Sequence, residues 1–406
     1  MTGIAFDPST SRPSITLGLL ALAHAVIHAQ SALMPLVYPI VIVQFSLDAR
    51  DIGIFIAVTT AVGGSMQLLY GVLTRYVARP ALLAGGQLVF GASLMVAGLA
   101  QSVGQLLAAI SAARVGGSPQ HPVGNALLSD AFPARRRGFA LSAHISGGNV
   151  GTILVPFVGA ALLASVGWQA TLVLFGVPAL LVGAAIALLV REDTRAYRAA
   201  ARSSGSVRSQ FWAVVRRRDL RLILGAALVA AGGRGLDIVA PFMLLYLRGP
   251  LGIDEETTAI LYALLLVGAV VGPLLAGWVS DRIGRRRTLV TYYLLSAAGI
   301  MAFLAAGANL WFLAPLLLPF GTAVFSESPV LQAYLADRAS GPQRDVAFSM
   351  YFTFAFGIGA VWAFVIGSVV SEWGFPVAFG VMAGSYLAAA TLLVAIRDRP
   401  GDHLPA

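Results

Sequence analysis

Apolar stretches of about twenty residues recur along the whole chain, and short polar segments separate them. A helix needs about 20 apolar residues to cross the hydrocarbon core of a bilayer. Open strands would leave unpaired backbone groups in lipid, so spanning segments of this kind are helices. The pattern therefore predicts twelve transmembrane helices. Their approximate ranges are 15–44, 51–74, 81–101, 104–128, 139–165, 168–190, 220–247, 255–279, 288–307, 309–334, 345–370 and 375–396.

The composition excludes most other classes of protein. Of the 406 residues, 58% are hydrophobic and 11% are charged, whereas a soluble domain has about 25% charged residues. Too few polar side chains remain to cover a water-facing surface, which excludes a soluble enzyme. All 27 basic residues are arginine, and with 18 acidic residues they give a net charge of +9. The arginines lie mainly in short loops between apolar stretches, which indicates membrane topology rather than binding of nucleic acid.

The distribution of arginines between the two sides predicts the orientation. With the N-terminus in the cytoplasm, 23 arginines fall on the inner side, and only Arg50 and Arg248 fall on the outer side. This bias predicts that both termini are cytoplasmic and that the number of spans is even. An alternative is that Arg12 and the following apolar run form a cleaved signal peptide. The apolar character continues to Phe45, which favours a membrane span.

Two loops repeat between the halves of the chain. The segment after the second span, around Arg75, matches the segment after the eighth span, around Asp281, at an offset of 206. Asp130 and Arg137 match Asp337 and Arg344 at an offset of 207. A duplicated six-helix unit of this kind is common in secondary transporters. We expect an N-terminal six-helix bundle at 1–190, a cytoplasmic basic linker at 191–219 and a C-terminal six-helix bundle at 220–406.

The loop Gly277-x-x-x-Asp281-Arg282-x-Gly284-Arg285-Arg286 resembles the signature loop of the major facilitator superfamily. The resemblance implies an all-α membrane protein, with twelve transmembrane helices in two six-helix bundles related by pseudo-twofold symmetry. The first-half copy is degenerate, because Arg75 replaces the acid. In physical terms, charge-assisted hydrogen bonds from the arginines to neighbouring helix ends would latch the cytoplasmic side; the alternative is a plain topology anchor. The predicted gate residues are Gly277, Asp281, Arg282, Gly284, Arg285, Arg286, Asp130, Arg137, Asp337 and Arg344.

Four ionisable residues lie within the predicted spans: Arg114, Arg234, Asp237 and Glu327. A charge at the centre of a span costs roughly 2.5–3.5 kcal/mol on insertion scales, so such residues are candidates for function. Arg234 and Asp237 are three residues apart and lie on one helical face, where they can pair. The family resemblance also implies a coupling role for Arg114.

Polar residues form stripes on two spans. His24, His28, Ser31 and Tyr38 share one face of the first span, and Arg114, Ser118, His121, Asn125 and Ser129 share one face of the fourth. His144 lies off the polar stripe of the fifth span, which favours a structural role. The residues predicted to bind solute are His24, His28, Tyr38, Gln67, Arg114, His121, Asn125 and Arg234. Those predicted to couple protons are Arg114, Asp237, Glu327, His24 and His28.

The fifth span contains Gly147-Gly148-Asn149-Val-Gly151 and Pro156. This segment is similar to the Gly-Pro motif of proton-coupled exporters, although Val155 and Ala160 stand where glycines are usual. Together with His121-Pro122-x-Gly124, it also resembles the fosmidomycin-resistance type of exporter. In physical terms, the glycines and proline allow close helix packing and a kink.

The sequence therefore predicts a secondary transporter of a small organic solute in the inner membrane, working by alternating access and by proton-coupled efflux. Proton-coupled import of an organic or inorganic anion is the alternative that two cavity arginines favour. A third hypothesis is a membrane sensor or scaffold that has lost transport activity. The spacing His24-x-x-x-His28 also suits a transition-metal substrate, but no acid or thiolate accompanies it. We expect no enzyme activity, no resident cofactor or metal, no nucleic-acid partner and function as a monomer.

Overall fold

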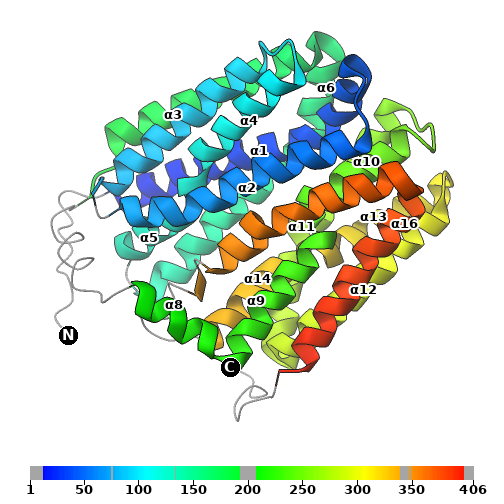
Figure 1. Ribbon diagram of the computed structural model, residues 1–406. Helices are drawn as coiled ribbons and strands as arrows, with labels where there is room; N and C mark the ends of the chain where they lie inside the picture. The colour runs from blue at the N-terminus through cyan, green and yellow to red at the C-terminus, as the bar shows by residue number, and fades with distance from the viewer. Residues whose placement is uncertain are drawn as a thin grey trace. The chain divides into compact units, whose positions relative to one another are not determined.

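The computed structural model describes residues 12–74, 76–132, 134–192, 207–338, 347–348 and 350–396. The side chains of residues 71, 72, 129, 130, 134–139, 141, 142, 146, 207–210, 281 and 336 lie outside this description. Within the described ranges the chain is almost entirely helical, and none of it is strand (Figure 1). The predicted all-α fold is therefore confirmed.

Helices cover the first six predicted spans. They are α1 (Pro13–Phe45), α2 (Ala49–Leu73), α3 (Arg79–Ala97), α4 (Val103–Gly117), the short turn η1 (Ser118–Gln120), α5 (Pro122–Ala131) and α6 (Ala134–Leu189). The fourth predicted span is thus interrupted, because the turn at η1 contains a proline that separates α4 from α5. The helix α6 contains Gly167 at a φ of 77°, so it comprises two spans with a break between them.

The second half begins with α8 (Val207–Arg216). It continues through α9 (Arg218–Ala230), η2 (Ala231–Gly233), η3 (Gly235–Val239), α10 (Ala240–Arg248), α11 (Glu255–Ile283), α12 (Arg285–Ala306), α13 (Leu310–Phe325), α14 (Glu327–Arg338), η4 (Thr353–Gly357), η5 (Ile358–Ala360) and α16 (Val361–Val394). The seventh predicted span is broken between η2 and η3, and the tenth is broken at Ser326. Gly374, at a φ of 81°, divides α16 into two spans.

Nine helices in the described part of the chain are long and apolar enough to cross a membrane by length and composition. Two of them are 47 and 45 residues long, about 70 Å of helix each, which is more than twice the hydrocarbon thickness of about 30 Å. Each of these two contains one of the glycine breaks. The fourth span is divided into α4 and α5, and neither helix is long enough to be one of the nine. The observed helices are therefore consistent with twelve spans.

Polar residues fix several helix ends. The side chain of Asp254 accepts a hydrogen bond from the backbone N–H of Thr257 at 2.9 Å and so caps α11. Ser102 caps α4 in the same way. Gly284 separates α11 from α12 with a φ of 89°, a conformation that a residue with a side chain rarely adopts. The signature glycine thus sets the sharp turn of this loop.

The described chain groups into two compact units. Unit 1 comprises residues 1–31, 62–155 and 161–205, and unit 2 comprises residues 32–61, 156–160 and 206–406. The end of α1 and the beginning of α2 therefore pack with unit 2. Within that unit, the hydroxyl of Tyr262 on α11 donates to the backbone carbonyl of Ala32 at 3.0 Å. The predicted division at 191–219 stays a prediction.

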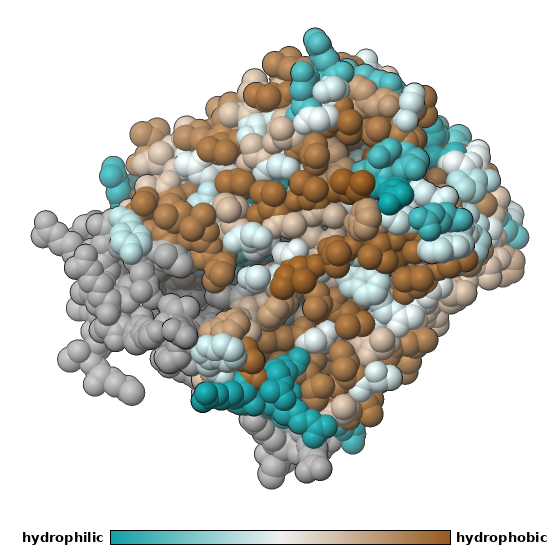
Figure 2. Space-filling view, viewed as in Figure 1, coloured by the Kyte–Doolittle hydropathy of each residue, from teal (hydrophilic) through white to brown (hydrophobic). Residues whose placement is uncertain are grey.

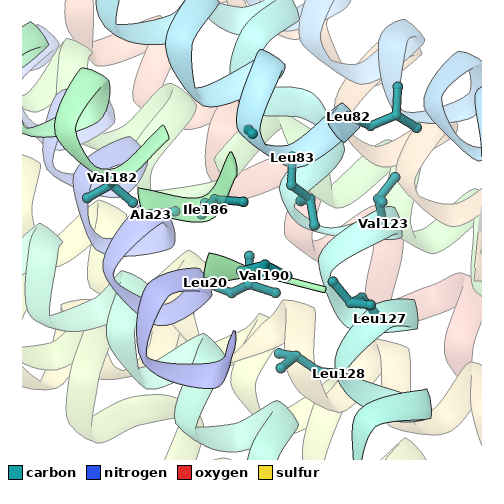
Figure 3. Packing of buried hydrophobic residues seen from close by; sticks show 11 residues of the cluster. Leu20, Ala23, Leu82, Leu83, Val123, Leu127, Leu128, Val182, Ile186 and Val190 are labelled. Carbon is teal, nitrogen blue, oxygen red and sulfur yellow. The ribbon is translucent and has the colours of Figure 1, made fainter. Parts of the chain in front are cut away.

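The core of unit 1 joins α1, α3, α5 and the end of α6. Its members come from these four helices, as the labelled side chains in Figure 3 show. They include Leu20 and Ala23 of α1, which are fully buried. The next residue along α1 is His24, so this packing fixes the helix that carries the first predicted site residues.

Close backbone contact between α1 and α6 depends on glycine. A Cβ atom at Gly147 would lie 2.6 Å from the carbonyl oxygen of Ala21, and one at Gly151 would collide with the carbonyl of Ala25. Small residues let transmembrane helices approach in this way. The glycine motif of the fifth span therefore has a packing role against α1.

Large apolar side chains are exposed across the surface. Val43 is 80% exposed, Leu99 72% and Trp311 89%. Figure 2 shows apolar residues over most of the visible face, with hydrophilic residues gathered toward its margins. A protein that exposes this much apolar surface is suited to a lipid environment rather than to water.

Candidate functional site

Four histidines of unit 1 form a compact group, which we call the histidine cluster: His24, His28, His121 and His144. The ring centroid of His24 lies 4.3 Å from that of His28 and 4.9 Å from that of His121, both in edge arrangements. The ring of His144 stacks on that of His24 at 4.5 Å. The structure thus brings three predicted site residues together and adds one that we expected to be structural.

Hydrogen bonds orient two of these rings. His24 Nδ1 lies 2.9 Å from the backbone carbonyl oxygen of His144. A carbonyl oxygen only accepts, so Nδ1 carries the hydrogen and Nε2 carries the lone pair. That Nε2 atom is buried and has no hydrogen-bond partner among the described residues. His28 Nδ1 lies 3.4 Å from the hydroxyl of Thr152 on α6.

The break in the fourth span positions His121. The short turn η1 ends at Gln120, whose side-chain amide donates to the carbonyl of Leu20 on α1 at 2.7 Å. This bond ties the break to α1 just before His24. Gly148 of α6 lies against the His24 ring, because a Cβ atom there would be 3.1 Å from the imidazole. The cluster therefore depends on α1, η1 and α6 together.

Arg114 lies on α4 and its guanidinium faces α1. Its Nη1 donates to Ser31 Oγ at 3.1 Å, and Ser31 is one turn beyond His28. Arg114 is half-buried, and none of the described carboxylates forms an ion pair with it. Unit 1 therefore holds a cation without an acidic partner beside a group of imidazoles.

Unit 2 holds a second polar group, the charged cluster: Arg234, Asp237 and Glu327. Arg234 Nη1 lies 3.8 Å from Asp237 Oδ2, and Arg234 Nε lies 3.9 Å from Glu327 Oε1. The i,i+3 pairing predicted for Arg234 and Asp237 is present. Glu327 is buried, and its Oε2 has no hydrogen-bond partner among the described residues. Two carboxylates thus share one guanidinium.

The backbone is broken where Arg234 lies. Arg234 has an extended conformation, with a φ of −62° and a ψ of 132°, between η2 and the wide turn η3. Its Nη1 donates to the carbonyl of Ala355 at 2.5 Å, in another irregular turn, η4. Its guanidinium lies 4.2 Å from the ring centroid of Phe356. Irregular backbone at membrane depth is typical of segments that line a cavity or lie buried in protein.

The other predicted binding residues, Tyr38, Gln67 and Asn125, belong to neither cluster. Tyr38 lies in unit 2, where its ring packs on Phe55 at 5.8 Å, although it shares a helical stripe with His24 of unit 1. Gln67 and Asn125 belong to unit 1. Each has a side-chain oxygen without a hydrogen-bond partner in the part of the chain that the structure describes.

The loop after α11 joins neighbouring helix ends in unit 2. Arg285 Nε lies 3.4 Å from Asp337 Oδ2 of α14, and Arg285 also donates to Ser280 Oγ. Arg286 donates to the carbonyl of Ile396 at 2.5 Å. Arg282 lies 3.5 Å from the ring centroid of Trp278. These contacts link the loop to α14 and to the residues that follow α16.

Several predicted gate residues fall outside the description. The side chains of Asp130, Arg137 and Asp281 are not described, and Arg344 lies outside the described residues altogether. At Gly277, a Cβ atom would meet nothing within 4 Å, so packing alone does not require glycine there. A separate buried pair, Arg79 with Glu192, joins the start of α3 to the end of α6.

Comparison with known proteins agrees with this fold. The model of the major facilitator superfamily matches residues 20–236 and 222–406. A fosmidomycin resistance protein of Escherichia coli is 23% identical over 388 residues, covering 94% of this chain and 93% of that protein. The 4-hydroxybenzoate transporter PcaK of Pseudomonas putida is 24% identical over 277 residues, 61% of each chain.

The crystal structure of the nucleoside transporter NupG is similar in fold, with a TM-score of 0.74 at 13% identity, and it covers 94% of this chain and 98% of that one. The family model matches nearly the whole chain in two overlapping segments. The chain therefore belongs to the major facilitator superfamily.

Proposed function

We propose that the protein exports a small organic solute across the inner membrane in exchange for protons, by alternating access. Members of this superfamily carry small-molecule solutes, so the chain is a multi-pass membrane transporter and not an enzyme. The orientation with both termini in the cytoplasm and function as a monomer belong to the proposal.

The observation that carries the proposal is that the ionisable groups of the two units have opposite balances of charge. Arg114 has no acidic partner among the described side chains, whereas Arg234 has two, Asp237 and Glu327. With all groups ionised, the charged cluster has one negative charge in excess. One proton can neutralise that excess, and Glu327 is the better acceptor, because it is buried and has an oxygen without a hydrogen bond.

The complementary role falls to Arg114. A half-buried guanidinium without an acid attracts the anionic or strongly polar part of a solute. We propose that solute binds beside Arg114, with His24 and His28 taking part in binding and proton exchange. Binding of a proton at Glu327 would then favour one conformational step of the transport cycle, and release of solute from Arg114 would favour the opposite step.

Two further observations support export and gating. The similarity to a fosmidomycin resistance protein extends over more than nine tenths of both chains, and resistance to a toxic compound is consistent with efflux. The contact of Arg285 with Asp337 can latch the cytoplasmic ends of the helices, as we expect for the signature loop.

The test uses inverted membrane vesicles that contain the protein, an imposed pH gradient and an internal pH-sensitive dye. The first probe is fosmidomycin, followed by a panel of organic acids and toxic compounds. We expect at least one solute to cause proton movement that Glu327→Gln abolishes and that Glu255→Gln, an exposed control, preserves. Absence of solute-dependent proton movement across the panel would contradict proton coupling.

The second candidate is proton-coupled import of an anion. Arg114 favours it, and so does the similarity to a 4-hydroxybenzoate transporter. Radiolabelled 4-hydroxybenzoate and inorganic anions offered to whole cells distinguish the two directions. Net accumulation that requires the protein would favour import, whereas net loss from preloaded cells would favour export.

A further inference from the structure

The three histidines His24, His28 and His121 present a set of metal-ligating atoms. One ring nitrogen of each residue lies within 4.8 Å of one ring nitrogen of each of the others. In a tetrahedral zinc site the Zn–N bonds are about 2.0–2.1 Å, so ligand nitrogens lie about 3.4 Å apart. The farthest pair would have to approach by at most about 1.4 Å to reach tetrahedral geometry.

The orientation of His24 matches that of a metal ligand. Its Nδ1–H donates to a backbone carbonyl, that of His144, and this leaves the lone pair of Nε2 directed away from that bond. The Nε2 atom is buried without a hydrogen-bond partner among the described residues, in a side chain that is 1% exposed. Burying an unsatisfied nitrogen costs free energy, and a bound cation would recover that cost.

The described residues supply three ligands to this site rather than four. His144 stacks on His24 and contributes its carbonyl oxygen, but its ring does not belong to the ligating group. Three histidines with an open fourth position are typical of zinc sites that exchange a ligand. The guanidinium of Arg114 bonds to Ser31, one turn beyond His28, and pairs with no described carboxylate; this positive charge disfavours a bare dication and favours an anion as the fourth ligand.

We propose that His24, His28 and His121 bind a divalent transition metal of the zinc class, with an anion or water in the fourth position. His28 and His121 are half-buried, so the ion has access to the site, while His24 forms its buried base. The bound ion ties α1 to the break between α4 and α5. This proposal does not depend on the solute or on the direction of transport, but a bound ion would remove His24 and His28 from the proton exchange proposed above, because their lone pairs would be coordinated.

The test is a titration of the full-length protein with Co²⁺, which replaces zinc and absorbs visible light when it is tetrahedrally bound. The protein is purified in detergent with a tag that contains no histidine. We expect the protein to bind one Co²⁺ per chain. Added Zn²⁺ should displace the Co²⁺ and abolish its visible absorption. Equilibrium dialysis with Zn²⁺ gives an independent measure of affinity and stoichiometry.

Variants assign the ligands. We expect His24→Gln, His28→Gln and His121→Gln each to weaken Zn²⁺ binding by about tenfold or more. His403→Gln is the matched control, because it removes the fifth histidine of the chain, and it should bind as the wild type does. His144→Phe preserves the carbonyl and a stacking ring, so it too should retain the metal.

Two results would overturn the proposal. One is a wild-type protein that binds no Co²⁺ or Zn²⁺ above the level of a variant lacking all three ligands. The other is metal binding that persists in each of the three variants that lack one ligand but disappears in His403→Gln. A wild-type protein that binds no Co²⁺ or Zn²⁺ overturns the proposal even where a variant fails to fold.

Discussion

The histidine cluster of unit 1 and the charged cluster of unit 2 occupy comparable positions, each at a break in a predicted span, but their chemistry differs. The first consists of imidazoles and lies beside Arg114, which pairs with no described carboxylate, whereas the second consists of one cation and two acids. Buried ionic groups need partners for stability, whereas imidazoles can be buried neutral. The comparison suggests that the charged cluster must stay paired to remain folded, while unit 1 can bind and release a ligand.

Removing the cation of the charged cluster should have the largest effect. Arg234→Leu leaves Glu327 and Asp237 without a counter-ion and removes the bond to the Ala355 carbonyl. Breaking a buried pair in this way costs about 3–5 kcal/mol. We expect a large loss of thermal stability in detergent, measured by the temperature of aggregation, together with loss of transport.

The matched control is an arginine with an exposed partner. Arg248 lies 3.8 Å from Glu255, and their side chains are 34% and 52% exposed. Arg248→Leu should cost about 1 kcal/mol or less. Equal destabilisation by the two substitutions would mean that burial of the charged cluster has no special consequence.

Removing the cation of unit 1 should affect transport rather than stability. Arg114→Ala leaves no buried acid behind, because no described carboxylate pairs with it; it loses the bond to Ser31. We expect transport of the identified solute to be abolished while the amount of folded protein in the membrane is unchanged. Normal transport by this variant would remove the proposed role of Arg114 in binding solute.

A smaller effect should follow from crowding the histidine cluster. In Gly148→Ala the new methyl group would lie 3.1 Å from the His24 ring, and overpacking of this kind costs about 1–3 kcal/mol. Gly124→Ala is the control, because its methyl group would lie 3.7 Å from the His144 ring, an ordinary contact. Thermal unfolding of both variants measures the difference, which should be seen only for Gly148→Ala.

The sequence predicts the membrane fold and most of the candidate residues, because both follow from the cost of polar groups in lipid. Apolar stretches locate the spans, and the buried charges stand out within them. The pairing of Arg234 with Asp237 is predicted from helical spacing and is present, although the structure makes it across the break at Arg234 rather than along a continuous helix. The signature loop indicates the superfamily, which the family model then shows.

Features that depend on contacts between helices are not predictable in this way. His144 lies off the polar stripe of its own span, yet it packs on His24 because α6 approaches α1 closely at glycines. The interruption at Arg234 places its guanidinium on the Ala355 carbonyl, a partner more than one hundred residues away. The glycines around Arg234 were a signal for this break, although hydropathy alone indicates an unbroken span.

We propose that the charged cluster carries the coupling proton while unit 1 binds the solute. The most direct measurement counts protons moved per solute in proteoliposomes for the wild type and for Glu327→Gln. We expect that the variant still exchanges labelled solute across the membrane but moves no protons with it. A variant that keeps the wild-type number of protons per solute would show that Glu327 does not carry the coupling proton.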